Sequence, residues 1–242
     1  MNLCIDQGNS STKVGVFNQN DLIESFTFEQ FGKSDILNLI SKFSIDRCII
    51  SSVVLENKEL TEELKRNFKL FFELSQETAV PIENKYSTPE TLGKDRLAAV
   101  VGASFLKPDS ATLVIDAGTA ITYDFIDPNR VYWGGNIAPG LNLRLRALHE
   151  FTQKLPLVEA KAESPFIGDT TDSAILSGAI YGIVFEVDGY INELKIKYPQ
   201  LSVFLTGGST FYFAAKLKNA IFAERNLVLI GLNRILQYNV QK

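Results

Sequence analysis

The sequence predicts a duplicated α/β fold, in which two lobes of order β-β-β-α-β-α enclose a cleft. A repeat carries this prediction, because residues 3–12 (LCIDQGNSST) align with residues 113–122 (LVIDAGTAIT) and share Leu, Ile, Asp, Gly and Thr at matching places. Strand-like and helix-like segments then follow in the same order after each copy. The 242 residues, 45% of them hydrophobic, suffice for two small cores.

The first half begins with a predicted β-hairpin. Residues 2–6 and 12–18 are β-rich runs, and the Gly, Asn and Ser residues between them are typical of a turn. A third strand is expected at 21–28. Apolar residues at helical spacing predict a helix over 33–43, and the continuous apolar run at 48–54 predicts a buried strand.

Four further segments complete the first half: a helix at 57–67, a strand at 68–74, a polar loop at 83–96 and an apolar helix at 96–106. Pro and Asp within residues 107–110 mark a break before the next strand. We therefore expect the lobes to span residues 1–108 and 109–242.

The second half restarts the strand–turn–strand pattern. Its expected elements are strands at 111–116, 121–127 and 130–138, helices at 141–154 and 172–198, a strand running into the Gly-Gly turn at 201–209, a short strand at 227–230 and a helix at 232–238. The interior glycines of the helix at 172–198 are expected to allow close packing. Loops such as 83–96 carry function more often than regular elements do.

Composition excludes several classes of protein. The net charge of −4 gives no basic surface for nucleic acid. No stretch approaches the roughly 20 apolar residues of a membrane span, and the N-terminus lacks the positive region of a signal peptide. We expect a cytoplasmic protein without nucleic-acid or membrane partners.

The cysteines and the single histidine offer no familiar site. Cys4 and Cys48 lie in β-like apolar runs without zinc-ligand spacing, so we expect buried, reduced thiols. A Ser–His–Asp triad would have to use His149, and no GxSxG nucleophile motif accompanies it. The FGKS segment at 31–34 resembles the end of a P-loop, but Thr27 stands where the first glycine is needed.

The two aligned turns have the chemistry of a phosphate site. Backbone N–H groups and hydroxyls can cradle phosphate oxygens, and glycine lets the backbone approach closely. Asp6 and Asp116 would repel phosphate but can hold a cation that binds it. A single Asp-x-Gly hairpin is a common turn, whereas its recurrence with the acid favours nucleotide binding.

The repeat and the element order are those of the ribonuclease-H-like superfamily, also called the actin-like ATPase fold. Sugar kinases, acetate kinase and actin share it. This analogy concerns the fold and leaves the substrate open.

A second polar motif, GKDR at 93–96, precedes an apolar helix. The carboxylate of Asp95 can orient a substrate hydroxyl and accept its proton during phosphoryl transfer. The planar fork of Arg96 suits an anionic or polar substrate. The alternative is a surface turn held by salt bridges at the start of a helix.

Six motifs in order resemble the type III pantothenate kinase family over nearly the whole chain. They are DQGNSSTK at 6–13, YSTPETLGKDR at 86–96, DAGTAITYD at 116–124, GGNIAPGLNLRLRALHEFTQKLP at 134–156, GDTTDSAILSGAIYG at 168–182 and LTGG at 205–208. The resemblance implies an ATP-dependent kinase that converts pantothenate to 4′-phosphopantothenate, the first step of coenzyme A biosynthesis. It also implies Mg²⁺, a monovalent cation (K⁺ or NH₄⁺) and a homodimer.

The resemblance also implies a role for each matching residue. Asp95 resembles the catalytic base, Asp116 the ligand of the monovalent cation, and Asp6 a Mg²⁺ ligand through water. The implied pantothenate contacts are Tyr86, Gly93, Lys94, Asp95, Arg96 and Thr171. The implied ATP contacts are Asp6, Gln7, Gly8, Asn9, Ser10, Ser11, Thr12, Lys13 and Thr119.

One position departs from the family pattern. Thr170 stands where the family usually has Asn, which leaves the hydrogen bonding beside Thr171 open. Two other functions also remain at this point. One is a non-catalytic member of the fold, which would be expected to lose Asp95 or one phosphate turn. The other is a different phosphoryl enzyme, such as an acyl kinase, a sugar kinase or a polyphosphatase.

Overall fold

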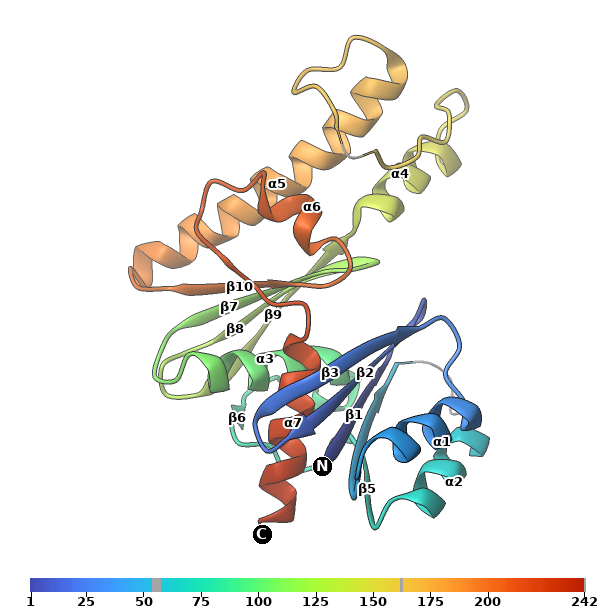
Figure 1. Ribbon diagram of the computed structural model, residues 1–242. Helices are drawn as coiled ribbons and strands as arrows, with labels where there is room; N and C mark the ends of the chain where they lie inside the picture. The colour runs from blue at the N-terminus through green and yellow to red at the C-terminus, as the bar shows by residue number, and fades with distance from the viewer. Residues whose placement is uncertain (54–57, 162, 242) are drawn as a thin grey trace. The chain divides into compact units, whose positions relative to one another are not determined.

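The structure is a computed structural model that describes residues 1–53, 58–161 and 163–241 (Figure 1). Judged by the contacts between its residues, the chain forms two compact units. The first unit comprises Met1–Asp109, Ile126–Trp133 and Asn226–Lys242, and the second comprises Ser110–Phe125 and Gly134–Arg225. These units are defined by contacts between residues, whereas the lobes 1–108 and 109–242 are predicted from the repeat. The lobe division therefore stays a prediction.

The first unit is built on a five-stranded sheet of order β3-β2-β1-β4-β5. Its strands are β1 (Asn2–Gln7), β2 (Thr12–Asn18), β3 (Asp21–Phe28), β4 (Arg47–Ser52) and β5 (Leu70–Glu73). The predicted hairpin is confirmed, because β1 pairs antiparallel with β2. β4 lies parallel to β1. Residue 54, expected at the end of β4, lies outside the described residues.

Helices cover both faces of this sheet (Figure 1). On one face, α1 (Lys33–Lys42) and α2 (Lys58–Asn67) pack into a core with alternate side chains of the strands. Residue 57, expected to begin α2, lies outside the described residues. On the other face, α7 (Leu227–Val240) contacts β1, β2 and β4.

The two cysteines lie on opposite faces of the sheet. Leu3 is in register with Cys48 and Cys4 with Ile49, and successive side chains of a strand point to opposite sides. Both thiols are buried and free, as predicted. Burial raises the pKa of each thiol well above its usual value.

Helices α3 (Lys94–Leu106) and α7 cross with their backbones in contact. A Cβ atom added to Gly102 would lie 2.4 Å from the Leu227 carbonyl oxygen, and one added to Gly231 would lie 1.7 Å from that of Ala98. The predicted strand at 227–230 is wrong, because these residues form the first turn of α7. Helix and strand look alike in a short apolar run that is buried all round.

The second unit contains strands β7 (Thr112–Ala117), β8 (Ala120–Ile126), β9 (Val131–Pro139), β10 (Ser202–Thr206) and β11 (Phe222–Ala223). Their order is β9-β8-β7-β10-β11, with β10 parallel to β7 and to β11. This order is that of the first sheet, strand for strand, which confirms the duplicated α/β fold. Strand β9 begins in the first unit, where it pairs with β6 (Glu83–Asn84).

One face of the second sheet packs against α4 (Leu141–Glu150), α5 (Thr171–Lys197) and α6 (Thr210–Ala214). α4 ends before the predicted residue 154. Beyond it the chain folds back, so that His149 Nδ1 lies 2.9 Å from the Leu155 carbonyl oxygen. Neither α6 nor β11 was predicted.

Within the described chain, α5 is the one helix long and apolar enough to cross a membrane by length and composition. The expectation that no stretch approaches a membrane span is therefore wrong by these two criteria. More than half of its apolar window is buried, as in the core helices of soluble proteins that meet the same criterion. The packing role expected of its glycines is wrong for Gly178 and Gly189, since a Cβ atom at either position would meet no atom within 4 Å.

Candidate active site

The β1–β2 turn presents a short polar loop. The Gly8 N–H donates a 3.0 Å hydrogen bond to the Ser11 carbonyl oxygen, which closes the turn. Asn9 and Ser10 at its tip are exposed, and Lys13 is half-buried. The loop therefore offers hydroxyl, amide and ammonium groups at the surface, as a phosphate site requires.

The base of this turn is tied to β4. Asp6 is in register with Lys13 on β2 and with Ser51 on β4. The Ser51 hydroxyl is buried and has no hydrogen-bond partner among the described residues. Ser52 Oγ donates to Gln7 Oε1 at 3.0 Å, which fixes the Gln7 side chain. Ser51 could not be selected from the sequence, because only the strand register places it beside Asp6.

The second turn brings Asp116 against the LTGG segment. Asp116, near the end of β7, is in register with Thr206 on β10. Gly207 has φ +93°, and a Cβ atom there would lie 2.3 Å from Asp116 Oδ1. The glycine is needed both for its left-handed backbone and for the space that the carboxylate occupies.

The other side of this turn packs against the start of α4. The Gly140 N–H donates to the Thr119 carbonyl oxygen at 3.0 Å. A Cβ atom at Gly140 would lie 2.4 Å from the carbonyl oxygens of both Gly118 and Thr119. The Thr119 side chain itself is exposed. This turn is thus tighter and less polar than the Asp6 turn.

The GKDR motif lies on a helix and not in a loop. The predicted loop at 83–96 contains β6 and a 3₁₀ turn at Pro89–Thr91, and α3 already begins at Lys94, after Gly93. The correction has a physical reason, because an acid such as Asp95 is favourable in the first turn of a helix. Asp95 Oδ1 accepts a 2.9 Å hydrogen bond from the Arg96 N–H.

Gly93 leaves room for the Asp95 carboxylate. A Cβ atom at Gly93 would lie 2.6 Å from Asp95 Oδ1. If Asp95 is the base that the resemblance implies, Gly93→Ala should turn the carboxylate away and lower kcat by about 10- to 100-fold, since misplaced reacting groups lose much of their effectiveness. Steady-state kinetics with ATP and pantothenate, the substrates that the resemblance implies, measures the loss.

The matched control for this change is Gly32→Ala. Gly32 also precedes a helix, α1, but a Cβ atom there would meet nothing within 4 Å. We expect its kcat to equal that of the parent. Equal kcat values for Gly93→Ala and the parent would contradict the placement of Asp95 in the reaction.

Arg96 forms one wall with two tyrosines. It is 7% exposed, and its guanidinium carbon lies 5.6 Å from the ring centroid of Tyr86. Tyr86 stacks in turn on Tyr132, with centroids 6.2 Å apart and an interplanar angle of 11°. Lys94 points elsewhere, with Nζ 3.8 Å from Glu73 Oε1.

The predicted contact Thr171 is the first residue of α5, and its side chain is exposed. Thr170 is the N-cap, and its Oγ1 accepts a 3.2 Å hydrogen bond from the Ser173 N–H. Thr170, which stands where the family usually has Asn, therefore still caps the helix, because Thr and Asn both serve as N-caps.

A partly buried polar network in the second unit was not predicted. Glu186 on α5 accepts 2.7 Å hydrogen bonds from Tyr123 on β8 and from Arg144 on α4. Burial, followed by this hydrogen bond, raises the pKa of Tyr123. The network joins three elements far apart in the sequence, and no local pattern signals it.

The described contacts thus join the predicted residues into separate groups: the Asp6 turn, the Tyr86–Gly93–Asp95–Arg96 group of the first unit, and the Asp116 turn of the second. Thr171 lies apart on α5. Across the described residues there is no cluster of three or more His, Cys, Asp or Glu side chains that could hold a metal ion.

The profile of the family described as type III pantothenate kinase matches residues 2–193 of this chain. The chain belongs to the type III pantothenate kinase family. A type III pantothenate kinase of Phocaeicola vulgatus is 51% identical over 239 residues, covering 99% of each chain. The family predicted from the six motifs is confirmed.

Solved structures show the fold that these kinases share with more distant proteins. A protein of Campylobacter jejuni described as a putative Baf family transcriptional activator has TM-score 0.60 and 24% identity, covering 99% of this chain and 100% of that one. A ROK family glucokinase of Streptomyces griseus, in complex with glucose and AMPPNP, has TM-score 0.52 and 11% identity, covering 100% and 99%. At these identities the likeness concerns the fold alone, and it agrees with the predicted ribonuclease-H-like fold.

Proposed function

We propose that Asp95 acts as the base when this chain transfers the γ-phosphoryl group of ATP to the primary hydroxyl of pantothenate. ATP-dependent phosphorylation of pantothenate, the first step of coenzyme A biosynthesis, is the activity of the family to which the chain belongs. The observation that carries the residue assignment is the first turn of α3. There Gly93 makes room for the Asp95 carboxylate, next to the wall of Tyr86 and Arg96.

The first unit supplies the chemistry that phosphoryl transfer needs. The transition state is loose, so most of the catalysis comes from positioning and from neutralising charge. Asp95 orients the hydroxyl and accepts its proton late, which requires little basicity. Arg96 and Tyr86 contact the substrate beside Gly93, and Lys94 joins them only by leaving Glu73.

ATP phosphates are assigned to the polar turn of residues 6–13, and Thr119 stays a further proposed ATP contact. The Gly8 backbone, the exposed Asn9 and Ser10, and the half-buried Lys13 provide the donors. The Ser51 hydroxyl, buried beside Asp6 and without a partner among the described residues, supports this assignment, because buried polar groups usually have a hydrogen-bond partner and a bound ligand would supply one.

The oxygen donors at Asp6 and at Asp116 also fit the two expected cations, Mg²⁺ and a monovalent cation. Mg²⁺ binds through one or two carboxylates, waters and substrate phosphates, and the half-buried Asp6 at the phosphate turn suits that mode. Asp116, next to the carbonyl-rich Gly118–Thr119 turn, offers the oxygen donors that K⁺ or NH₄⁺ accepts. These cations would neutralise phosphate charge when bound.

Activity is therefore expected to depend on both pantothenate and K⁺. In a coupled assay, ATP consumption should require pantothenate and should rise on adding KCl at constant ionic strength. Asp116→Asn should lose the response to K⁺, because it removes the charged ligand. Glu193→Gln, which removes an exposed carboxylate from α5, should keep the response. ATP consumption at the same rate with and without pantothenate would contradict pantothenate as the substrate. An equal response to K⁺ in Asp116→Asn and the parent would contradict Asp116 as the ligand of the monovalent cation.

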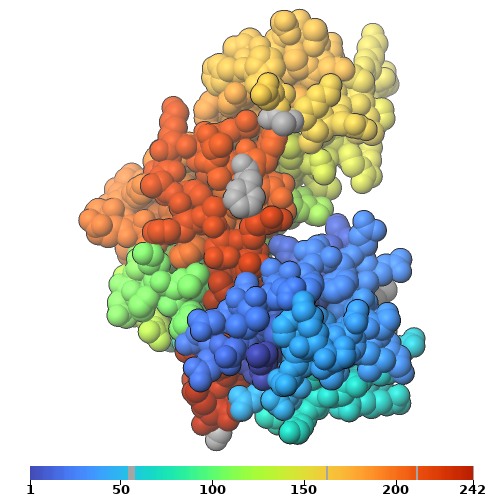
Figure 2. Space-filling view, viewed as in Figure 1, coloured from blue at the N-terminus to red at the C-terminus, as the bar shows by residue number. Residues whose placement is uncertain are grey.

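An exposed aromatic cluster on the second unit supports a homodimer. Phe166 and Phe185 are more than half exposed, and Phe166 packs edge-on against Tyr181 with centroids 4.9 Å apart. Figure 2 shows part of the surface of this unit in yellow to orange, the colours of the chain from about residue 150 to residue 190. Apolar patches of this kind mark interaction surfaces. Because α5 also carries Thr171, dimerisation through this face would place Thr171 near a second subunit.

The change Phe185→Glu is expected to convert a dimer into a monomer in sedimentation experiments, because it would bury a charge in the interface. Ile196→Glu is the matched control. Ile196 is 77% exposed on the same helix but is not part of the aromatic cluster, so the dimer should persist. An unchanged mass for Phe185→Glu would place the interface elsewhere.

The remaining expectations concern location and partners. The net charge of −4 and the buried face of α5 favour a cytoplasmic enzyme that binds neither nucleic acid nor membrane. Retention of the protein in the soluble fraction after cell lysis would agree with this expectation.

A further inference from the structure

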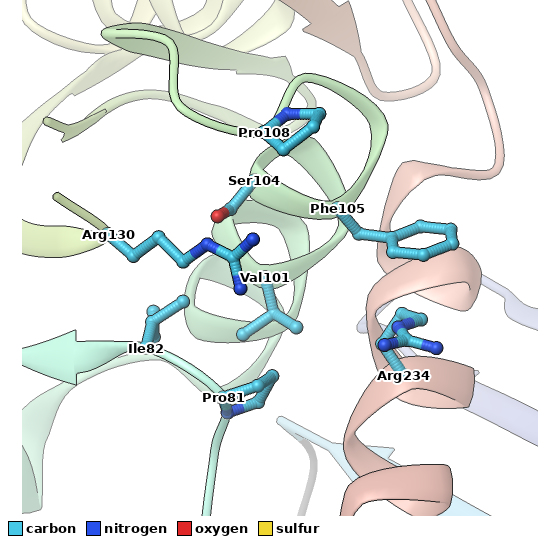
Figure 3. Close-up of a pocket in the computed structure, with 8 residues that line it drawn as sticks. All are labelled: Pro81, Ile82, Val101, Ser104, Phe105, Pro108, Arg130 and Arg234. Carbon is cyan, nitrogen blue, oxygen red and sulfur yellow. The ribbon is translucent and has the colours of Figure 1, made fainter. Parts of the chain in front are cut away.

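The first unit contains a cavity of about 260 Å³ (Figure 3). It lies where the end of α3, the middle of α7, the segment before β6 and the turn before β9 meet. Its walls are formed by Pro81, Ile82, Val101, Ser104, Phe105, Pro108, Arg130 and Arg234. None of these residues takes part in the proposed kinase site.

Two guanidinium groups enter the cavity from different walls (Figure 3). Arg130 lies in the turn before β9, and none of the described residues forms a hydrogen bond or an ion pair with its side chain. Arg234 comes from α7, where its guanidinium carbon lies 4.2 Å from the Phe105 ring centroid. None of the described residues that line the cavity carries a carboxylate. Two positive charges therefore share this space without an opposite charge among those residues.

The position of Arg234 is fixed by its neighbours. Its Nη1 donates to Gln237 Oε1 at 2.7 Å and to Asn20 Oδ1 at 3.3 Å, both neutral acceptors. Burial lowers the pKa of Arg234, and the charge of Arg130 lowers it further. Both effects disfavour the charged form, and a bound anion would relieve both.

The rest of the lining is apolar apart from one hydroxyl. Pro81, Ile82, Val101 and Phe105 offer hydrocarbon and ring surfaces, and Ser104 contributes its side-chain oxygen. Ligand pockets typically enclose about 300 to 1,000 Å³. A cavity slightly below that range admits a small molecule with one anionic group and one apolar group.

The cavity is separate from the proposed kinase site. Both involve α3, but Asp95 lies in its first turn and Ser104 in its last. With a rise of 1.5 Å per residue, the two positions are roughly 13 Å apart along the helix axis.

We propose that this cavity is a second ligand site, which binds a small phosphomonoester through Arg130, Arg234 and the Ser104 hydroxyl. A phosphate group fits this set better than a carboxylate does, because its two charges and three oxygens can engage both planar guanidinium forks. The apolar part of the ligand packs on Phe105, Ile82 and Val101.

The test uses phenyl phosphate as the probe and the side-chain Nε–Hε NMR signals of the arginines as the readout. These signals report on the cavity itself, even if the probe also enters the kinase site. Phenyl phosphate is expected to shift the Arg130 and Arg234 signals with saturation. Inorganic phosphate should bind more weakly, because it lacks the apolar group, and benzyl alcohol should leave the signals in place.

Arg130→Asn identifies the Arg130 signal and removes one charge while keeping a residue that tolerates the φ of +62° found there. This change should raise the Kd for phenyl phosphate, measured from the Arg234 signal, by at least about tenfold, as expected for a lost charge-assisted hydrogen bond. Arg66→Gln, which removes an exposed arginine of α2, should bind like the parent. Signals that drift without saturation, or equal binding by Arg130→Asn and the parent, would overturn the proposal.

Discussion

Asp95→Asn is expected to lower kcat by about 10²- to 10⁴-fold, the range that general base catalysis contributes. The amide keeps the size of the side chain and can still accept the Arg96 N–H hydrogen bond that now holds Asp95 Oδ1 at 2.9 Å. It cannot accept the hydroxyl proton of pantothenate. Steady-state kinetics gives kcat, and a fluorescent ATP analogue gives nucleotide affinity, which should stay within about twofold of the parent because the ATP contacts are assigned to other residues.

The matched control is Glu59→Gln. Glu59 is an exposed acid in the first turn of α2, so this change also converts a carboxylate to an amide at the start of a helix in the same unit. Its kcat should equal that of the parent. Near-normal turnover by Asp95→Asn would remove Asp95 from the role of base, and a parallel loss of nucleotide affinity would point to a structural role instead.

Gly231→Ala is expected to lower the free energy of unfolding by about 3 kcal/mol or more, at the upper end of the cost of overpacking. The added Cβ atom would lie 1.7 Å from the Ala98 carbonyl oxygen, which belongs to the backbone of α3 and cannot rotate away. The helices would have to separate, and α7 also contacts β1 and β4. Urea unfolding followed by circular dichroism measures the change.

Gly189→Ala provides the comparison for this stability effect. Gly189 also lies within a helix, α5, but it is exposed and its added Cβ atom would meet no atom within 4 Å. Alanine is favoured over glycine in a helix by up to about 1 kcal/mol, so this variant should be as stable as the parent or more so. Equal urea midpoints of unfolding for Gly231→Ala and the parent would show that α3 and α7 can move apart at their crossing without loss of stability.

Strands and hairpins could be predicted well because their signals are local. The β1–β2 hairpin has alternating apolar residues on either side of a Gly-Asn-Ser turn, and β3 spans the residues expected for it. The repeat predicted the second sheet as well, because the same buried strand and the same Asp-x-Gly turn require the same neighbours. Membership of the family was also predictable from the order of six short motifs.

Elements set by tertiary packing were harder to predict. LVLI at the start of α7 is apolar on all sides because strands and α3 both contact that helix, so its periodicity is lost. The start of α3 is hard to predict because its N-cap, Gly93, has no side chain to form a capping hydrogen bond, so no Ser, Thr, Asp or Asn marks that position. The edge strand β11 has only two residues and so carries no pattern.

Contacts within the site could not be predicted from the sequence. The fit of Gly207 around Asp116 depends on the parallel register of β7 and β10, which no local motif encodes. The stacking of Tyr86 on Tyr132 likewise needs the pairing of β6 with β9. The sequence indicated which residues have useful chemistry, whereas the packing decides which of them meet.

The packing of α7 on the first unit has a consequence for the order of events during synthesis. Domains generally fold as units, N-terminal first, as the chain leaves the ribosome. Here the second unit is complete at Arg225, whereas the first still lacks the helix that covers β1 and closes against α3. The part that is translated first is therefore finished only after the second unit, and its exposed sheet face depends on α7, which is translated later than the whole of that unit.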